Sequence, residues 1–106
     1  MTLNVGEYGK VFVFSVGFDM SSQTALTLVF TKPDGTALTV TDPDVTVGSS
    51  TKSVDGIGTV TLNEYVEYTF ASGDVDQSGT WTAQLTYDEG AGKRLISEPA
   101  QFTVDD

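Results

Sequence analysis

Hydrophobic and polar residues alternate along most of the chain with a period of two, and no long stretch keeps a helical period. In the cleanest stretch, Thr80–Tyr87, the apolar set Trp81, Ala83, Leu85 and Tyr87 alternates with threonine and glutamine. Such alternation predicts half-buried strands, and the Thr, Val, Phe and Tyr content suits them. The other predicted strands are Lys10–Phe18, Ala25–Thr31, Thr36–Val40, Val45–Val47, Thr59–Leu62, Glu64–Phe70, and a last strand formed by Lys93–Ser97 and Ala100–Val104 with a bulge or strand switch at Pro99.

The first of these strands carries apolar residues on both faces. Phe12, Phe14 and Val16 share one face, whereas Val11 and Val13 share the other. A strand with two apolar faces is typical of a central or covered position in a sheet.

Turn residues separate the strands. Lys32-Pro33-Asp34-Gly35 has proline, aspartate and glycine in the order that favours a tight hairpin turn, and Asp88–Gly92 predicts a second hairpin loop. Gly48–Gly58 holds almost no apolar residue, so we expect an exposed loop there. Neither terminus has a pattern that would tie it down.

Seven or eight short strands at regular spacing predict an all-β fold, a two-sheet antiparallel sandwich in one domain over residues 1–106. Immunoglobulin-like domains often enter their penultimate strand through Asp-x-Gly/Ala-x-Tyr-x-Cys. Gly79 and Trp81 keep the Gly and Tyr spacing, Gln77 replaces Asp, and Ala83 replaces Cys. The sandwich is therefore predicted to be immunoglobulin-like. We expect its core anchors to be Phe14, Leu28, Phe30, Tyr68, Gly79, Trp81, Leu85 and Phe102.

Composition narrows the function. Fifteen acidic against five basic residues give a net charge of −10, which disfavours nucleic acid and anionic membrane surfaces as partners. The chain has no histidine, no cysteine and no Gly-x-Ser-x-Gly elbow, so we expect no enzyme and no cofactor. Paired aspartates such as Asp42 and Asp44 could hold Ca²⁺, but Asp-rich turns are common without metal, and no metal ligand is assigned.

Candidate contact residues are few. Tyr65 is out of phase with Tyr68, so one of the two is expected to face outward, and Tyr65 is the candidate for an interface. Lys10, Val11 and Val13 are the other candidates, because an exposed outer strand offers an edge to which a partner strand can add. The Gly48–Gly58 loop and the termini are further candidate contact regions.

Two stretches suggest a family. LTLVFTKPDGTALTV (Leu26–Val40) and YVEYTFASGDVDQSGTWTAQLTY (Tyr65–Tyr87) resemble the small N-terminal β-sandwich of tailed-phage baseplate upper proteins, and short immunoglobulin-like virion proteins of phages. The resemblance covers roughly Val11 to Val104. The baseplate proteins continue beyond this region into coiled-coil or receptor-binding parts, so we do not expect a receptor-binding role from the stretch that resembles them.

The resemblance implies a non-catalytic structural virion protein of the tail, baseplate, neck or capsid decoration. It would dock onto other virion proteins in multiple symmetric copies. The chain starts like a protein made in the host bacterial cytoplasm without an export signal, so the virion is its expected location. Two alternatives stay open: a carbohydrate- or cell-surface-binding immunoglobulin-like module, and a free regulatory or inhibitor domain with one soluble partner.

Overall fold

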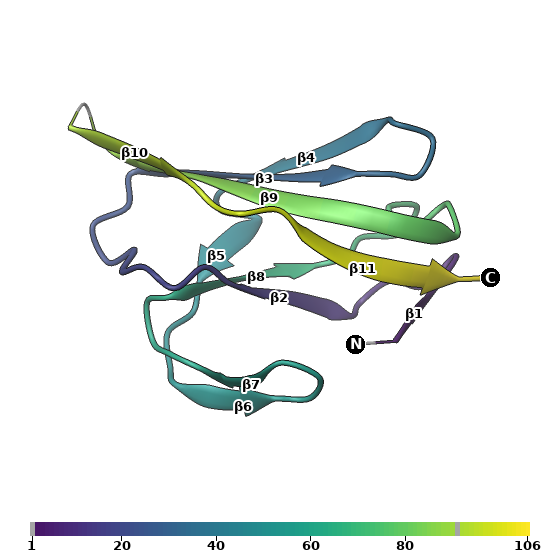
Figure 1. Cartoon of the computed structure of the whole chain (residues 1–106), viewed down its shortest axis with the longest axis horizontal. Coiled ribbons are helices and arrows are strands. Elements are labelled where there is room, and N and C mark those ends of the chain that lie inside the picture. The colour runs from purple at the N-terminus through teal and green to yellow at the C-terminus, as the bar shows by residue number, and fades with distance from the viewer. Residues whose placement is uncertain (1, 91) are drawn as a thin grey trace.

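The computed structural model describes residues 2–90 and 92–106, and this part of the chain is all-β, without a helix (Figure 1). Its strands are β1 (Leu3–Asn4), β2 (Val11–Ser15), β3 (Ala25–Thr31), β4 (Ala37–Thr41), β5 (Val45–Val47), β6 (Lys52–Val54), β7 (Gly58–Val60), β8 (Tyr65–Thr69), β9 (Gly79–Glu89), β10 (Lys93–Ile96) and β11 (Ala100–Asp105).

The larger sheet has six strands and is organised around β9. Its order is β1-β11-β9-β3-β4, and β10 pairs with the distal half of β9. Of the two outcomes predicted at Pro99, the bulge is found and the switch is not: β10 ends at Ile96 opposite Thr86, β11 starts at Ala100 opposite Ala83, and one extra residue separates the two pairs. All of these pairings are antiparallel except β1 with β11, which is parallel.

The smaller sheet has the order β2-β8-β5 and lies across from the larger one (Figure 1). Inward side chains of both sheets form one core cluster. The ring of Phe30 on β3 is central to it, with ring centroids 5.1 Å from Phe12 and 5.4 Å from Phe70 of the opposite layer. The structure buries these predicted anchors: Phe14, Leu28, Phe30, Tyr68, Trp81 and Leu85; Phe102 is partly buried against them.

The start of β9 explains why Gly79 and Trp81 stand where they do. Trp81 is fully buried, and its indole Nε1–H donates a hydrogen bond to the Gln77 carbonyl oxygen at 3.0 Å. Gly79 has φ +121°, and a Cβ there would lie 3.0 Å from Pro33 Cγ of the predicted Lys-Pro-Asp-Gly turn. The turn forms as expected, with the Gly35 N–H donating to the Lys32 carbonyl. The Lys-Pro-Asp-Gly turn and the start of β9 therefore pack against each other.

Gly48–Gly58 is not the loop that we expected, because a two-stranded sheet of β6 and β7 occupies most of it. Ile57 donates its N–H to the Val54 carbonyl and closes a turn around Asp55-Gly56. An Asp-Gly pair is among the strongest short-range hairpin signals, and the low apolar content of the flanks concealed it. Figure 1 shows this hairpin as a third layer, on the side of the small sheet that faces away from the large one.

Two further expectations are wrong. The N-terminal arm is tied down, because Leu3 pairs with Val104 and is fully buried. Of the central and covered positions predicted for the first strand, the central one is wrong, since β2 pairs with β8 alone and is an edge strand. Its second apolar face arises because Val11 and Val13 lie beside the tip of the β6–β7 hairpin, with which they line one cavity.

Candidate functional site

A groove opens where the edges of the two main sheets come together without pairing. It has a volume of about 350 Å³ and is lined by Val11–Ser15 of β2, Val54–Ile57 at the tip of the β6–β7 hairpin, and Ala100–Phe102 of β11. Three segments far apart in the sequence thus form its walls. We call it the edge groove.

The N-terminal arm explains why the groove stays open. β1 pairs with β11 at two positions, Leu3 with Val104 and Asn4 with Asp105, and therefore covers one end of β11. The chain then turns through Gly6 and Gly9, which both have positive φ, and enters β2 in the other sheet. Between these two points nothing in the described chain pairs with Ala100–Phe102 on the side facing β2.

Apolar side chains dominate the walls of the edge groove. Val11 is 44% exposed and Ile57 is 48% exposed, from opposite sides of the groove. Val13 is partly buried, and Phe12 and Phe14 form the floor on the core side. Exposed apolar groups around a concavity are typical of binding surfaces rather than of ordinary protein surface.

Of the sequence-predicted contact residues, Val11 and Val13 line the groove, whereas Lys10 lies next to it and is engaged elsewhere. The Lys10 ammonium forms a 2.9 Å ion pair with Glu7 and donates to the Thr2 carbonyl oxygen at 2.7 Å. The hydrogen bond from Lys10 and the backbone N–H of Asn4 lower the pKa of Glu7. Lys10 thus fastens the turn that leads into β2.

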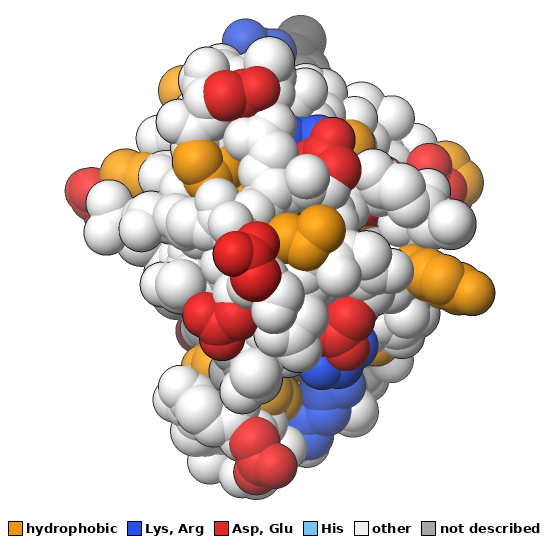
Figure 2. All heavy atoms as spheres, turned by 90° about the vertical axis from the view of Figure 1, so that its right-hand side faces the viewer, with side chains coloured by type: hydrophobic (Ala, Val, Ile, Leu, Met, Phe, Trp, Pro, Cys, Tyr) orange, Lys and Arg blue, Asp and Glu red, His pale blue; other side chains and the backbone are white. Residues whose placement is uncertain are grey.

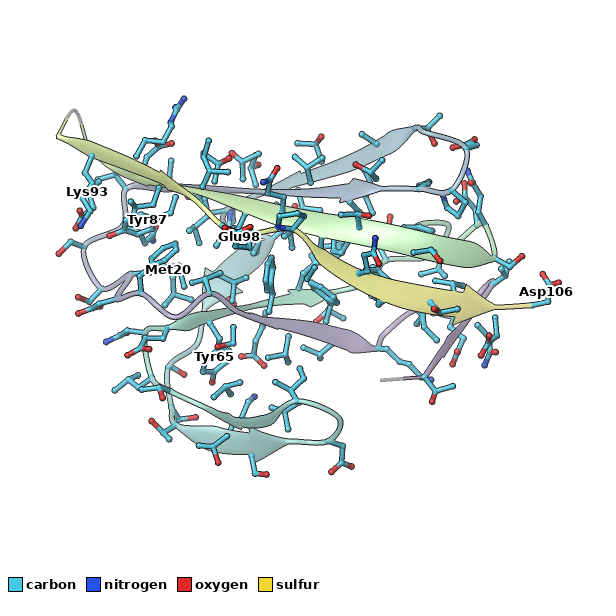
Figure 3. The ribbon with its side chains drawn as sticks, in the orientation of Figure 1. Met20, Tyr65, Tyr87, Lys93, Glu98 and Asp106 are labelled. Atoms are coloured by element: carbon cyan, nitrogen blue, oxygen red, sulfur yellow. The ribbon has the colours of Figure 1, made fainter. Side chains whose placement is uncertain are left out.

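Tyr65 and Tyr68 lie on opposite faces of β8, as expected, but both are buried, so the expectation that Tyr65 is a contact residue for a partner is wrong. Tyr65 does point away from the core, but the β6–β7 hairpin covers it, and Figure 3 shows Tyr65 between the small sheet and that hairpin. Its hydroxyl donates to the Ser50 carbonyl oxygen at 2.6 Å, and a Cβ on Gly48 would lie 2.0 Å from its ring. The side chain is therefore not available to a partner while the hairpin is in place.

The candidate contact region Gly48–Gly58 contains the hairpin tip, although it was expected as a loop and not as a hairpin. Sequence reasoning missed Ala100–Phe102, which form another of the three walls. Asp55-Gly56 could have revealed the tip as a turn. Nothing in the alternation of β11 marks an unpaired edge, because strand order in a sheet depends on contacts distant in sequence.

Several acidic side chains have partners within the fold. Asp42, of the pair considered for Ca²⁺, accepts a hydrogen bond from the Leu26 N–H at 3.1 Å. Asp76 pairs with Lys32 at 2.8 Å, Asp88 pairs with Arg94 at 2.7 Å, and Asp74 accepts hydrogen bonds from Tyr68 and the Ala71 N–H. Residues 2–90 and 92–106 contain no cluster of three or more side chains that could hold a metal ion. Figure 2 looks onto the end of the molecule that carries the C-terminus, where acidic side chains are scattered between small apolar patches and few basic groups.

Comparison with known proteins returned no matching family model, no matching curated protein and no matching solved structure. The resemblance to phage baseplate proteins therefore stays a prediction that depends on the two quoted stretches. In the part of the chain that the structure describes, no helix has the length and apolar character needed to cross a membrane.

Proposed function

We propose that this chain is a non-catalytic, immunoglobulin-like β-sandwich that acts by protein–protein docking, as a structural component of a tailed-phage virion. The tail, baseplate, neck and capsid decoration are all compatible positions.

The immunoglobulin-like assignment is supported by topology. Five strands in the order β1-β11-β9-β3-β4 face the three-stranded β2-β8-β5 sheet, and the first strand runs parallel to the last. Trp81 hydrogen-bonds backward to Gln77, as the corner tyrosine does in such domains, and Ala83 stands where a cysteine would bridge the sheets. Ala83 is fully buried between Phe30 and Ala100 of the neighbouring strands, so a small apolar residue fills that place.

The edge groove is the observation that carries the docking role. It is a concave, mostly apolar surface beside the unpaired edge of β2, and natural proteins seldom leave such an edge open. The virion context is supported by the resemblance of Leu26–Val40 and Tyr65–Tyr87 to baseplate proteins. A net charge of −10 agrees with subunits that stay soluble and separate until they dock.

The carbohydrate-binding alternative has less support. Sugar-binding faces generally offer exposed aromatic rings, and here Trp81, Tyr65, Tyr68 and Tyr87 are all buried. Tyr8, at 67% exposure, is the one exposed aromatic side chain within residues 2–90 and 92–106. A single ring is not a stacking platform.

Immunogold electron microscopy tests this proposal. An antibody raised against the purified chain is applied to phage particles from the lysate in which the chain is made. Labelling at a reproducible position on the particle is expected, and that position identifies the neighbouring virion protein. Recovery of the chain in the soluble fraction alone, with unlabelled particles, would contradict the virion role.

A further inference from the structure

The open edge of β2 has unused backbone hydrogen-bonding groups in a regular series. The Phe70 N–H donates to the Lys10 carbonyl at 3.0 Å, and the Val16 N–H donates to the Glu64 carbonyl at 2.9 Å. In an antiparallel pair, hydrogen-bonded and non-hydrogen-bonded positions alternate. With the β2–β8 register, even-numbered residues of β2 therefore bond to β8, and Val11, Val13 and Ser15 direct their N–H and C=O groups away from it.

Those outward groups have no hydrogen-bond partner in the described chain. No backbone or side-chain hydrogen bond involves the N–H or C=O of Val11, Val13 or Ser15 there, and β8 is the one strand that pairs with β2. β2 has five residues, so its open edge extends for about 17 Å at roughly 3.4 Å per residue. That length matches a short extended peptide.

The edge groove would receive the side chains of such a peptide. A strand added beside β2 directs alternate side chains to opposite faces. One set would enter the gap towards Phe12 and Phe102, and the other would face Val54 and Ile57 on the hairpin tip. Apolar residues at alternate positions therefore fit both walls.

Charge indicates the kind of partner. Asp55 lines the groove at the hairpin tip and forms no ion pair among the described residues. The chain carries a net charge of −10, so two copies repel each other, whereas a basic segment is attracted. We propose that the edge groove binds an extended segment of another protein, which adds to β2 as a strand and carries alternate apolar side chains and a Lys or Arg opposite Asp55. This inference rests on the docking function proposed above and specifies that docking occurs by strand addition.

A displayed library of about ten-residue peptides, with apolar residues fixed at alternate positions, tests the proposal on the full chain. Val13→Pro removes one outward N–H and obstructs the edge without breaking a bond to β8. Thr39→Pro is the matched control. The Lys32 N–H donates to the Thr36 carbonyl, so by the same alternation the N–H of Thr39 points outward from β4, which is an edge strand of the large sheet. Selected peptides should lose at least about tenfold in affinity for Val13→Pro and retain it for Thr39→Pro.

Amide hydrogen exchange on the unaltered chain supplies a second readout that does not depend on the variants folding. The Val11, Val13 and Ser15 amides should exchange quickly in the free chain and slow markedly when a selected peptide binds, while the Thr39 amide does not change. Selected peptides should also be enriched in Lys or Arg, and Asp55→Asn should lower their affinity for the chain.

Three results would overturn strand addition: no peptide enriched over background, selected peptides that bind Val13→Pro as well as the parent chain, or protection away from β2. Self-association that Val13→Pro abolishes would assign the edge to a second copy instead. The two proposals fail separately. If virions are unlabelled but peptides still bind, only the virion role is wrong. If virions are labelled and the Val13→Pro variant is incorporated as well as the parent chain, docking occurs through another face.

Discussion

Trp81 and Tyr65 are both fully buried aromatic residues whose polar atom donates to a backbone carbonyl, yet they belong to different kinds of structure. Trp81 reaches Gln77, four residues earlier, and lies in the main core. Tyr65 reaches Ser50, fifteen residues earlier, and lies outside that core beneath the β6–β7 hairpin. The first closes a local corner, whereas the second holds a separate layer onto the finished sandwich.

This difference predicts that damage at the two sites has different consequences. Loss of Trp81 removes ring contacts in the main core, with Phe30 of β3 at 6.4 Å and Phe102 of β11 at 5.9 Å between ring centroids. Loss of the contacts of Tyr65 should release the hairpin and leave the main core intact. The four predictions below test this division, from the largest expected effect to the smallest.

Trp81→Ala should reduce the free energy of unfolding by about 3–5 kcal/mol, because a large buried ring is replaced by a cavity. Since a domain of this size has about 5–15 kcal/mol in total, the variant should be close to unfolding. Urea denaturation followed by circular dichroism measures the change, because Trp81 is the sole tryptophan and its fluorescence is lost. Trp81→Phe keeps a ring but loses the donor to Gln77, so its free energy of unfolding should lie between those of the parent chain and Trp81→Ala. A cost under about 1 kcal/mol for Trp81→Ala would remove Trp81 from the core.

Gly48→Ala should cost about 3 kcal/mol, because the added Cβ would lie 2.0 Å from Tyr65 Cζ and the ring must move. Denaturation of the single variants and of the pair with Tyr65→Leu forms a double-mutant cycle. With leucine at position 65 the space near Gly48 is open, so the same glycine substitution should cost much less. Equal costs in the two backgrounds would show that the clash is not with Tyr65.

Tyr68 is an intermediate case, on β8 with Tyr65 but facing the core, and its hydroxyl donates to Asp74, six residues later. Burial first, and then this hydrogen bond, raise the pKa of Tyr68 from 10.0 to about 12. The folded chain therefore holds the proton more tightly than the unfolded chain. Its contribution is fully present below pH 10 and is lost as the pH rises to about 12, on the order of 2 kcal/mol.

Urea denaturation from about pH 9 to about pH 12 measures this loss, and Tyr68→Phe is the control because it cannot ionise. The difference in unfolding free energy between the parent chain and Tyr68→Phe should shrink across that interval. Parallel pH curves would contradict the raised pKa.

Features that depend on neighbours in sequence could be predicted. The alternation of Ala25–Thr31 gave the bounds of β3, and the Lys-Pro-Asp-Gly turn and the Trp81 corner formed as expected. Each is determined by a few consecutive residues: proline and glycine fix the turn, and an apolar residue at every second position fixes the buried face.

The features of the edge groove could not be predicted from the sequence, because they depend on which strands become neighbours in the fold. Apolar residues on both faces of β2 indicated a central or covered strand, whereas β2 is an edge strand whose second face lies beside the hairpin tip. Tyr65 lies on the outward phase of β8, and its burial depends on chain that folds back from β6 and β7. Period two identifies a face, but it does not show what covers that face.

Tyr65→Phe is the smallest and most specific test of that cover. It removes the hydroxyl that donates to Ser50 and leaves the ring against Gly48, so the free energy needed to open the hairpin should fall by about 1 kcal/mol or less. The effect should be local. Lys52 also bridges to Glu67 at 2.8 Å, so the hairpin should remain attached but open more often. Amide exchange in β6 and β7 should quicken up to about fivefold, while β3 and β9 should not change. Tyr8→Phe, at an exposed tyrosine, should alter neither. Equal acceleration in β9 would show that the hairpin and the sandwich unfold together, and that the third layer is part of the core rather than an addition to it.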